Sequence, residues 1–348
     1  MQVIKKRFLR VVLRGLLYFF ILLLVLIALV QFPYVQTRIV SWLTEGFSKN
    51  TGYTLFIDRV NIDWFDQVAI EGVGLYDPEN NRLLNADRVK VDFALNALIN
   101  RSNRNIDAVH ISGAEIFLTK ITVGDSVETL NINELVRRVK ELIKKERKTQ
   151  KYISVDHITL EDSNFIYDDP NRDSIPGFDY YHFRLNAING SFRNMLSIAD
   201  TLALDIEELR ATDEKTDLQL HNLKSFFRVS QQAMEFYDMN LEIGNSVLSD
   251  SIRFVYDNTA DMREFNTKVR MDAHLDESLI YSKDLGLFAY VFENYEDFYS
   301  ISGNFQGRVN NFNFTDASVK FGESTVLCCQ RGVFHRLRLY KFGYQPED

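Results

Sequence analysis

The sequence has few residues that could cross-link a chain of this length or divide it into separate parts. Its two cysteines, Cys328 and Cys329, are adjacent among 348 residues, so they cannot frame a fold with disulfide bonds or supply the spaced ligands of a zinc site. No long stretch rich in proline, glycine or serine separates two halves of the chain. This absence predicts one elongated domain rather than two independent ones.

Excess positive charge is also absent. The chain contains 40 lysines and arginines against 48 aspartates and glutamates, which gives a formal net charge of -8. A general nucleic-acid binder needs a basic surface, so nucleic acid is excluded as an expected partner. The hydrophobic fraction of 46% and the charged fraction of 25% are ordinary for a globular protein and exclude little more.

Motifs that carry catalysis are missing as well. No G-x-S-x-G elbow, Walker loop or H-E-x-x-H is present. Neighbouring carboxylates such as Glu207 and Glu208 would point to opposite faces of a strand, so they cannot form an acid–base pair. Residues 169–173 begin like a calcium loop, but Ser174 replaces the required glycine and Tyr180 stands where the bidentate glutamate belongs. We therefore predict no enzyme, no metal site and no cofactor.

The histidines give no contrary signal, because each occurs singly within a strand-like pattern. These residues are His110, His157, His182, His221, His274 and His335. We interpret them as ordinary strand residues rather than ligands or catalytic groups.

One long uncharged run stands near the beginning of the chain. Residues 15–30 read GLLYFFILLLVLIALV, and with the apolar neighbours on either side the run is long enough to span a bilayer. About a dozen Leu, Ile, Val and Phe residues, at roughly -0.3 to -0.6 kcal/mol each, outweigh the cost of Arg14 at its end. The positions expected within the membrane include Gly15, Leu16, Phe19, Leu23, Leu26 and Val30.

The charges around this run set its expected orientation. Cations precede it and Arg38 is the first to follow it, which predicts a cytoplasmic amino terminus. The topology residues are Lys5, Lys6, Arg7, Arg10 and Arg14. A cleaved signal peptide is the alternative, but the residues from Val30 to Pro33 are too bulky for its cleavage site. We predict that residues 1–32 form a cytoplasmic tip and a single-pass anchor, with the rest of the chain exported.

An amphipathic helix is predicted directly after the anchor, over residues 33–52. Pro33 suits its first turn and Gly52 its end. The apolar residues expected on one face are Val35, Ile39, Trp42, Leu43 and Phe47. This pattern leaves two interpretations open: a helix that lies on the outer leaflet, or a cap packed on the first strands.

Strand patterns occupy residues 53–325, and two of them change phase at a glycine. In VAIEGVGLYD, Val68 and Ile70 share one parity, whereas Val73 and Leu75 follow Gly72 on the other. The stretch VHISGAEIFL changes phase at Gly113, and residues 158–169 form a looser third copy. Because one extra residue shifts the alternation, the pattern predicts β-bulges that bend the strands.

The connections between these strands predict how they pair. Short turns, such as those at residues 77–82 and 101–105, favour an antiparallel sheet. A helical insertion at about residues 131–149 interrupts the sheet. Residues 326–348 have no clean periodicity and depart from the rest, as a truncated or frame-altered end would.

Together these patterns predict a mainly β fold in which a transmembrane helix precedes an elongated, twisted antiparallel sheet with a few capping helices. The apolar residues expected to line its inner face are Val60, Ile62, Val68, Ile70, Val73, Leu75, Val89, Val91, Phe93, Val109, Ile111, Ile116 and Leu118. A closed β-sandwich alternates in the same way and buries the same face. Periodicity alone does not choose between an open groove and a sandwich.

The order of these features resembles the amino-terminal region of the AsmA-like superfamily, and specifically the TamB-type translocation and assembly proteins of diderm bacteria. The resemblance is carried by the apolar run, by the segments at residues 32–91 and 109–118, and by DLGLFAYVFENYEDFYSISGNFQGRVNNFNF and VKFGEST further on. The matching positions are Pro33, Val35, Gln36, Gly52, Arg59, Val60, Trp64, Phe65, Gly72, Val73, Asp77, residues 83–86, Gly113 and Ala114. The likeness covers about residues 1–325, and its motifs are structural rather than catalytic.

The resemblance implies a taco-like β-groove, anchored in the bacterial inner membrane with its bulk in the periplasm. It further implies a role in moving phospholipid between the inner and outer membranes or in supporting the assembly of outer-membrane proteins. The expected partners are the inner membrane, phospholipid acyl chains and an outer-membrane assembly protein. A membrane-anchored periplasmic β-sandwich that binds or supports without conducting lipid is the alternative.

Overall fold

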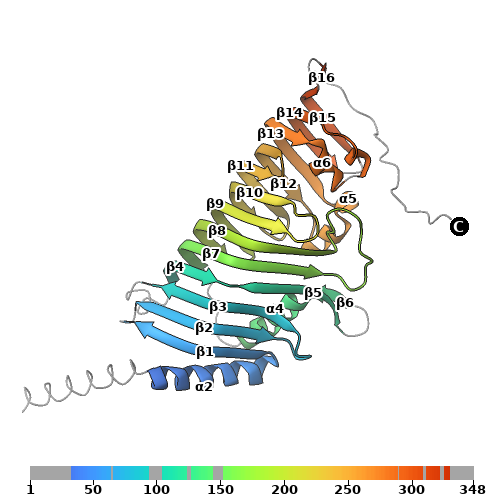
Figure 1. Cartoon of the computed structure of the whole chain (residues 1–348). Helices are drawn as coiled ribbons and strands as arrows, with labels where there is room; N and C mark the ends of the chain where they lie inside the picture. The colour runs from blue at the N-terminus through green and yellow to red at the C-terminus, as the bar shows by residue number, and fades with distance from the viewer. Residues whose placement is uncertain are drawn as a thin grey trace, which may run out of the picture.

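The computed structural model describes residues 33–63, 66–93, 104–123, 127–143, 152–288, 290–308, 311–321 and 325–329. Sixteen strands of this part belong to one sheet, which a few short helices flank (Figure 1). The predicted mainly β fold is therefore confirmed. The predicted anchor, residues 1–32, lies outside the described residues. In the described ranges no helix combines the length and the apolar composition needed to cross a membrane.

The elements follow one another along the chain with few interruptions. The strands of the first half are β1 (Thr54–Asp63), β2 (Gln67–Tyr76), β3 (Arg82–Asp92), β4 (Arg104–Ser112), β5 (Glu115–Val123), β6 (Val127–Leu130), β7 (Tyr152–Asp168) and β8 (His182–Ile198). Those of the second half are β9 (Thr201–Asp213), β10 (Gln219–Val229), β11 (Ala233–Ile243), β12 (Ser246–Val255), β13 (Arg270–Tyr281), β14 (Phe298–Arg308), β15 (Asn311–Phe321) and β16 (Thr325–Cys329). The helices are α2 (Pro33–Thr51), α4 (Asn131–Ile143), η1 (Thr259–Glu264), α5 (Phe265–Lys268), α6 (Ser282–Gly286) and η2 (Tyr290–Phe292).

One boundary differs from the sequence-based expectation. The sheet continues to Cys329, four residues into the segment that was expected to depart from it. Helix α4 is described from Asn131 to Ile143, and its predicted end at about residue 149 lies outside the described residues.

Strand pairing follows chain order with one exception. Most neighbours pair antiparallel, as the short turns predict, but β4 and β5 both pair parallel with β7. The prediction of a wholly antiparallel sheet was therefore wrong at this point. The connection between β5 and β7 contains β6 and helix α4, and a crossover of that length can return the chain parallel to the strand it left.

Helix α2 lies along β1, the first strand of the sheet (Figure 1). The Gln36 side chain is 1% exposed; its Nε2 donates to the Ile62 carbonyl oxygen at 3.4 Å, and its Oε1 accepts from the Ile62 backbone nitrogen at 3.1 Å. Ser48 Oγ accepts from the Leu55 nitrogen at 3.1 Å. Side chains of α2 thus occupy backbone groups on the free edge of β1, where another chain could otherwise add a strand.

Helix α2 is described from Pro33, and Gly52 follows its last residue in a left-handed conformation, as predicted for its end. Of the residues predicted on its apolar face, Val35 and Phe47 are half-buried, whereas Trp42 is 72% exposed and does not pack on the sheet.

Helix α4 closes one end of the sheet over a small hydrophobic core. This core consists of Tyr53, Leu75, Leu83 and Leu135, with Phe47, Leu55, Leu84, Ile132 and Val139 packed against it. Glu134 fixes the helix, because it is 7% exposed and accepts hydrogen bonds from Arg137 Nε at 2.7 Å and from Arg138 Nε at 2.9 Å. Arg138 also donates to the Thr51 carbonyl oxygen at 2.9 Å, which joins α4 to the end of α2.

The phase changes expected from the sequence occur along one row of the first four strands. Gly72 and Gly113 have φ of 62° and 61°, and a Cβ at these positions would lie 1.9 Å from Asp58 Oδ2 and 2.1 Å from Asp87 Oδ2. The register of β1, β2, β3 and β4 is unbroken here, so no strand carries an extra residue. The predicted bulge was therefore wrong at Gly72 and Gly113; a left-handed glycine lies where each strand changes phase.

The same irregularity recurs in later strands at non-glycine residues. Left-handed φ angles occur at Asp162, Ala187, Asp238, Glu277 and Asp316, and the residue after each is buried: Ser163, Ile188, Met239, Ser278 and Ala317. From β7 to β15 these positions coincide with shifts in register, as true bulges require, so the bulge predicted within residues 158–169 is confirmed. We call this line of left-handed and shifted positions the crease.

Side chains replace backbone hydrogen bonds within the crease. The Ala114 nitrogen donates to Ser163 Oγ at 3.1 Å, the Ser249 nitrogen to Ser278 Oγ at 3.0 Å, and the Glu277 nitrogen to Ser302 Oγ at 2.9 Å. Because an unpaired buried N–H costs as much as a lost hydrogen bond, these serines let the sheet bend without leaving amides unsatisfied.

Replacing a crease glycine should destabilise the fold. Gly113→Ala introduces a Cβ against Asp87 at a left-handed position, which should lower the free energy of unfolding by about 1–3 kcal/mol. Gly46→Ala is the matched control, because Gly46 lies inside α2 with nothing within 4 Å of its Cβ position; it should raise the free energy of unfolding by about 0.5–1 kcal/mol. Urea titration of both variants measures the two effects, and equal shifts would contradict this account of the crease.

Glu134 should make the stability of the fold depend on pH in the acidic range. Its hydrogen bond from Arg137 lowers its pKa from the ordinary 4.5 to about 2. A carboxyl whose pKa is depressed in the folded state stabilises the protein above its unfolded pKa, and this contribution is lost as pH falls through the folded pKa. The stability difference between the native chain and Glu134→Gln should thus be largest at neutral pH and shrink between about pH 4.5 and 2. Urea titrations across that range test it, and a difference independent of pH would contradict it.

Candidate functional site

The candidate site is an apolar face formed by rows of side chains that cross the sheet from strand to strand. One row, in β1 to β8, consists of Ile62, Val68, Val91, Val109, Ile158 and Phe192. It continues through β9 to β15 as Leu204, Phe227, Phe236, Ile252, Ala273, Phe305 and Phe314. Ile206 pairs with Phe192 and lies two residues from Leu204, so both parts of the row point to the same side of the sheet.

A second row runs beside the first. In the first half its members are Val60, Ile70, Val89, Ile111 and Leu160. This row leaves the apolar series at β8, because Leu160 pairs with Gly190. A separate row accompanies the first in the second half of the sheet: Leu202, Val229, Met234, Phe254, Met271 and Phe312, with Gly307 between the last two. It begins at β9, where Leu202 pairs with Ser197 of β8. Neighbouring strands lie about 4.8 Å apart, so the first row, which crosses from β1 to β15, extends for roughly 60 Å.

Most of these side chains are half-buried. Val60 at 4% exposed and Ala273 at 8% are buried, whereas Val91, Val109, Phe227, Phe236 and Phe305 are intermediate. In the part of the chain that the structure describes, the strands belong to one hydrogen-bonded sheet and are not divided into two sheets. The apolar face is therefore not the interior of two separate packed sheets.

The structure brings together most of the residues that the sequence predicts on this face. Ile62, Val68, Val91 and Val109 share one row, and Val60, Ile70, Val89 and Ile111 share the next. Val73 pairs with Ala86, and Ile116 pairs with Leu84. Leu118 lies beside Tyr167 on β7, and Phe93 follows the last residue of β3.

Two of these predicted residues are not accessible. Leu75 belongs to the core beneath α4, and Val60 is buried. Their burial was not predicted, because alternation indicates the side of a strand to which a residue points but not what covers it.

Sequence reasoning missed the aromatic half of the apolar face. Phe227 and Phe236 have ring centroids 5.0 Å apart, and Phe305 and Phe312 are stacked at 4.4 Å. The available signal was the alternation of phenylalanine with charged residues in SFFRV and MEFYD. Phe226 and Tyr237 lie on the opposite side of the same strands, 38% and 36% exposed.

The opposite face of the sheet is polar and carries rows of ion pairs. Arg193 Nε lies 2.8 Å from Glu207 Oε1, and Arg253 Nε lies 2.9 Å from Glu235 Oε1. Arg228 also pairs with Glu235, and its hydrogen bond is the main cause that lowers the pKa of this carboxyl. Charge on one side and hydrocarbon on the other make the sheet amphipathic across its whole length.

Two histidines that looked isolated in the sequence meet on this polar face. His110 and His157 have ring centroids 6.3 Å apart, and His110 Nδ1 lies 2.6 Å from Thr159 Oγ1. Parallel pairing of β4 with β7 brings them together, which the sequence could not show. Across the described ranges, no group of three or more His, Cys, Asp or Glu side chains could hold a metal ion.

The calcium-like turn at residues 169–173 has a structural role. Asp169 is fully buried and pairs with Lys120, so its carboxylate links this turn to β5. Asp179, 1% exposed, closes the same loop. Burial raises the pKa of Asp179, but the hydrogen bonds from Ser174, Ile175 and Tyr181 outweigh burial and lower it to about 2.

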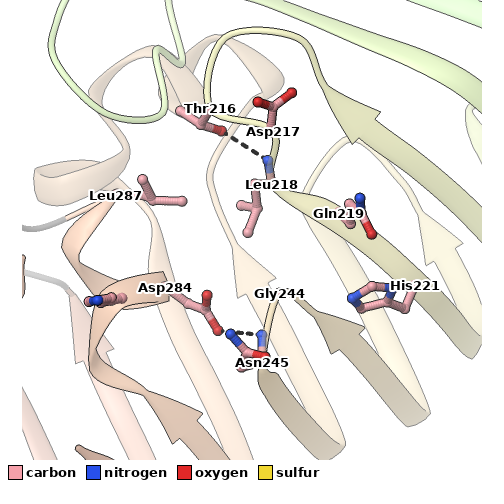
Figure 2. Close-up of a pocket in the computed structure, with 10 residues that line it drawn as sticks. Thr216, Asp217, Leu218, Gln219, His221, Gly244, Asn245, Asp284 and Leu287 are labelled. Atoms are coloured by element: carbon pink, nitrogen blue, oxygen red, sulfur yellow. Dashed lines mark hydrogen bonds between the residues drawn. The ribbon is translucent and has the colours of Figure 1, made fainter. Parts of the chain in front are cut away.

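This loop reaches across the ends of several strands to α6. The Phe178 nitrogen donates to the Leu287 carbonyl oxygen at 2.9 Å, and the Phe178 and Phe288 rings are 5.3 Å apart. Figure 2 shows the pocket of about 330 Å³ between the turns, lined by Thr216, Asp217, Leu218, Gln219, His221, Gly244, Asn245, Lys283, Asp284 and Leu287. Asp284 accepts from the Asn245 nitrogen at 2.8 Å and from Ser246 Oγ at 2.6 Å. These contacts tie the turns together along one rim.

No protein-family model matches the chain, and no curated protein matches it in sequence. The resemblance to TamB-type proteins therefore stays an expectation from the residues alone.

Proposed function

We propose that this chain carries phospholipid acyl chains along its apolar face in a bacterial cell envelope. It is anchored in the inner membrane by residues 1–32, and its sheet lies in the periplasm, where it passes lipid between the two membranes or supports outer-membrane assembly. The observation that carries the proposal is that the first apolar row has a member on each strand of the path from β1 to β15, with a shift of two residues between β8 and β9.

Continuity matters because of the cost of exposing hydrocarbon to water. Moving one sixteen-carbon chain from an apolar surface into water costs on the order of 12 kcal/mol, at about 0.8 kcal/mol per methylene. A gap in the surface would impose part of that cost at one point of the route. Each strand of the first row supplies an apolar side chain or, at Ala273, a small residue, so a tail could shift by one strand spacing at a time.

The burial pattern favours an open face over a closed sandwich. The interior of a sandwich is sealed between two packed sheets, which would bury its large apolar side chains almost completely. Here Phe227, Phe236 and Phe305 are only half-buried, and their strands belong to one sheet. Bulges increase twist and bend strands, so the crease would curl the two flanks of the sheet into a trough.

Photo-crosslinking can test the proposal with matched neighbours on one strand. Phe227 faces the apolar rows and Phe226 the polar side of β10, so the same benzophenone amino acid at either position alters the fold to a similar degree. Position 227 should capture phospholipid in cells several-fold more than position 226, since only the apolar face shelters a tail.

A second matched pair lies on the next strand. Phe236 pairs with Phe227, and Tyr237 pairs with Phe226 on the polar side. Lipid captured equally at positions 236 and 237, or at neither, would reject the apolar face as a lipid surface.

A further experiment tests conduction, because the crosslinkers would also capture a lipid that binds without moving. The Phe227→Lys variant should interrupt the first apolar row near its middle. Lipid capture by a crosslinker at position 314 or at position 91, whichever lies downstream in the direction of lipid movement, should then fall. The Phe226→Lys variant should leave lipid capture at both positions unchanged. Capture that stays unchanged on both sides of the block would favour the alternative, a binding module that does not conduct lipid.

A further inference from the structure

Helix α2 has a second face that the sheet does not use. Its inner face packs on β1 through Gln36 and Ser48, whereas Tyr34 and Trp42 are each 72% exposed. At 100° per residue, the exposed stripe covers an arc of roughly 80°. Its members are Tyr34, Arg38, Trp42, Glu45 and Lys49, all exposed.

The chemistry of this stripe suits the headgroup region of a bilayer. Tryptophan and tyrosine combine an apolar ring with a polar atom and are enriched where hydrocarbon meets water. Arg38 lies over the Tyr34 ring, with its guanidinium carbon 5.9 Å from the ring centre. Arginine and lysine in such a stripe can reach phosphates while their stems stay on the apolar side.

The sequence before α2 limits how far this stripe can lie from the membrane. The uncharged run ends at residue 30, and α2 begins at Pro33. Three residue steps span at most about 11 Å, so a membrane-spanning run would hold the start of α2 at the bilayer surface. Tyr34 is the second residue of that helix.

We infer that the outer stripe of α2 lies in the lipid headgroups of the membrane that holds the anchor. This inference rests on the anchoring part of the proposed function and not on lipid movement. Because α2 lies along β1 and the strands stack away from it (Figure 1), the inference sets the β1 end of the apolar face at the membrane and the β16 end farthest from it.

Fluorescence quenching of the full chain in vesicles tests the inference. The chain contains two tryptophans, so Trp64→Phe leaves Trp42 as the single emitter. The probes are vesicles of phosphatidylcholine and phosphatidylglycerol with a spin label near the headgroup, and acrylamide in the water. The labelled lipid should quench Trp42 at least about threefold more than a water-exposed tryptophan, and acrylamide should quench it correspondingly less.

The matched control moves the tryptophan to a distant exposed aromatic position. Tyr295, 52% exposed, lies after η2 near β14, so Tyr295→Trp combined with Trp42→Phe and Trp64→Phe should respond to acrylamide and not to the labelled lipid. Equal lipid quenching at both positions, or a chain that does not float with vesicles, overturns the inference. The quenching measurement does not depend on lipid transport. If the labelled lipid quenches Trp42 but no lipid is crosslinked at position 227, only the conduction of lipid is rejected.

Discussion

The structure depends on keeping the backbone hydrogen bonds of one very wide sheet satisfied while the sheet bends. A flat ladder would need no irregular residues, and a bend without compensation would leave buried amides unpaired. At the crease, short acidic, glycine and serine residues let the sheet bend and keep its buried amides hydrogen-bonded. Left-handed Gly72 and Gly113 lie beneath Asp58 and Asp87, and serines such as Ser163 and Ser278 accept from amides of the neighbouring strand.

The apolar face follows from that arrangement. When neighbouring strands change phase at the same row, their apolar side chains stay on one side of the sheet on both flanks of the crease. Leu55, Leu75 and Leu84 therefore stay aligned on one flank, as Val60, Ile70 and Val89 do on the other. A phase change in one strand alone would have placed valines among the ion pairs of the polar face.

The contacts at the first edge and at one rim of the sheet differ from those in its middle. At the first edge, the Gln36 amide takes the place of a neighbouring strand, so α2 removes a site at which sheets aggregate. On the same helix, the Trp42 side chain does not pack on the sheet and is exposed. At one rim, the loop that holds Asp169 and Asp179 joins α6 through Phe178 and Leu287 and ties several turns into one unit.

The sequence by itself determined the properties that depend on near neighbours along the chain. Alternation identified strands and the side to which Val91 or Val109 points, Gly52 marked the end of α2, and the phase changes at Gly72 and Gly113 were visible in the residues. Only the tertiary structure decided the parallel pairing of β4 with β7, the burial of Leu75 beneath α4 and the exposure of Trp42. The physical reason is that register and burial are set by partners dozens of residues away, and local periodicity contains no information about them.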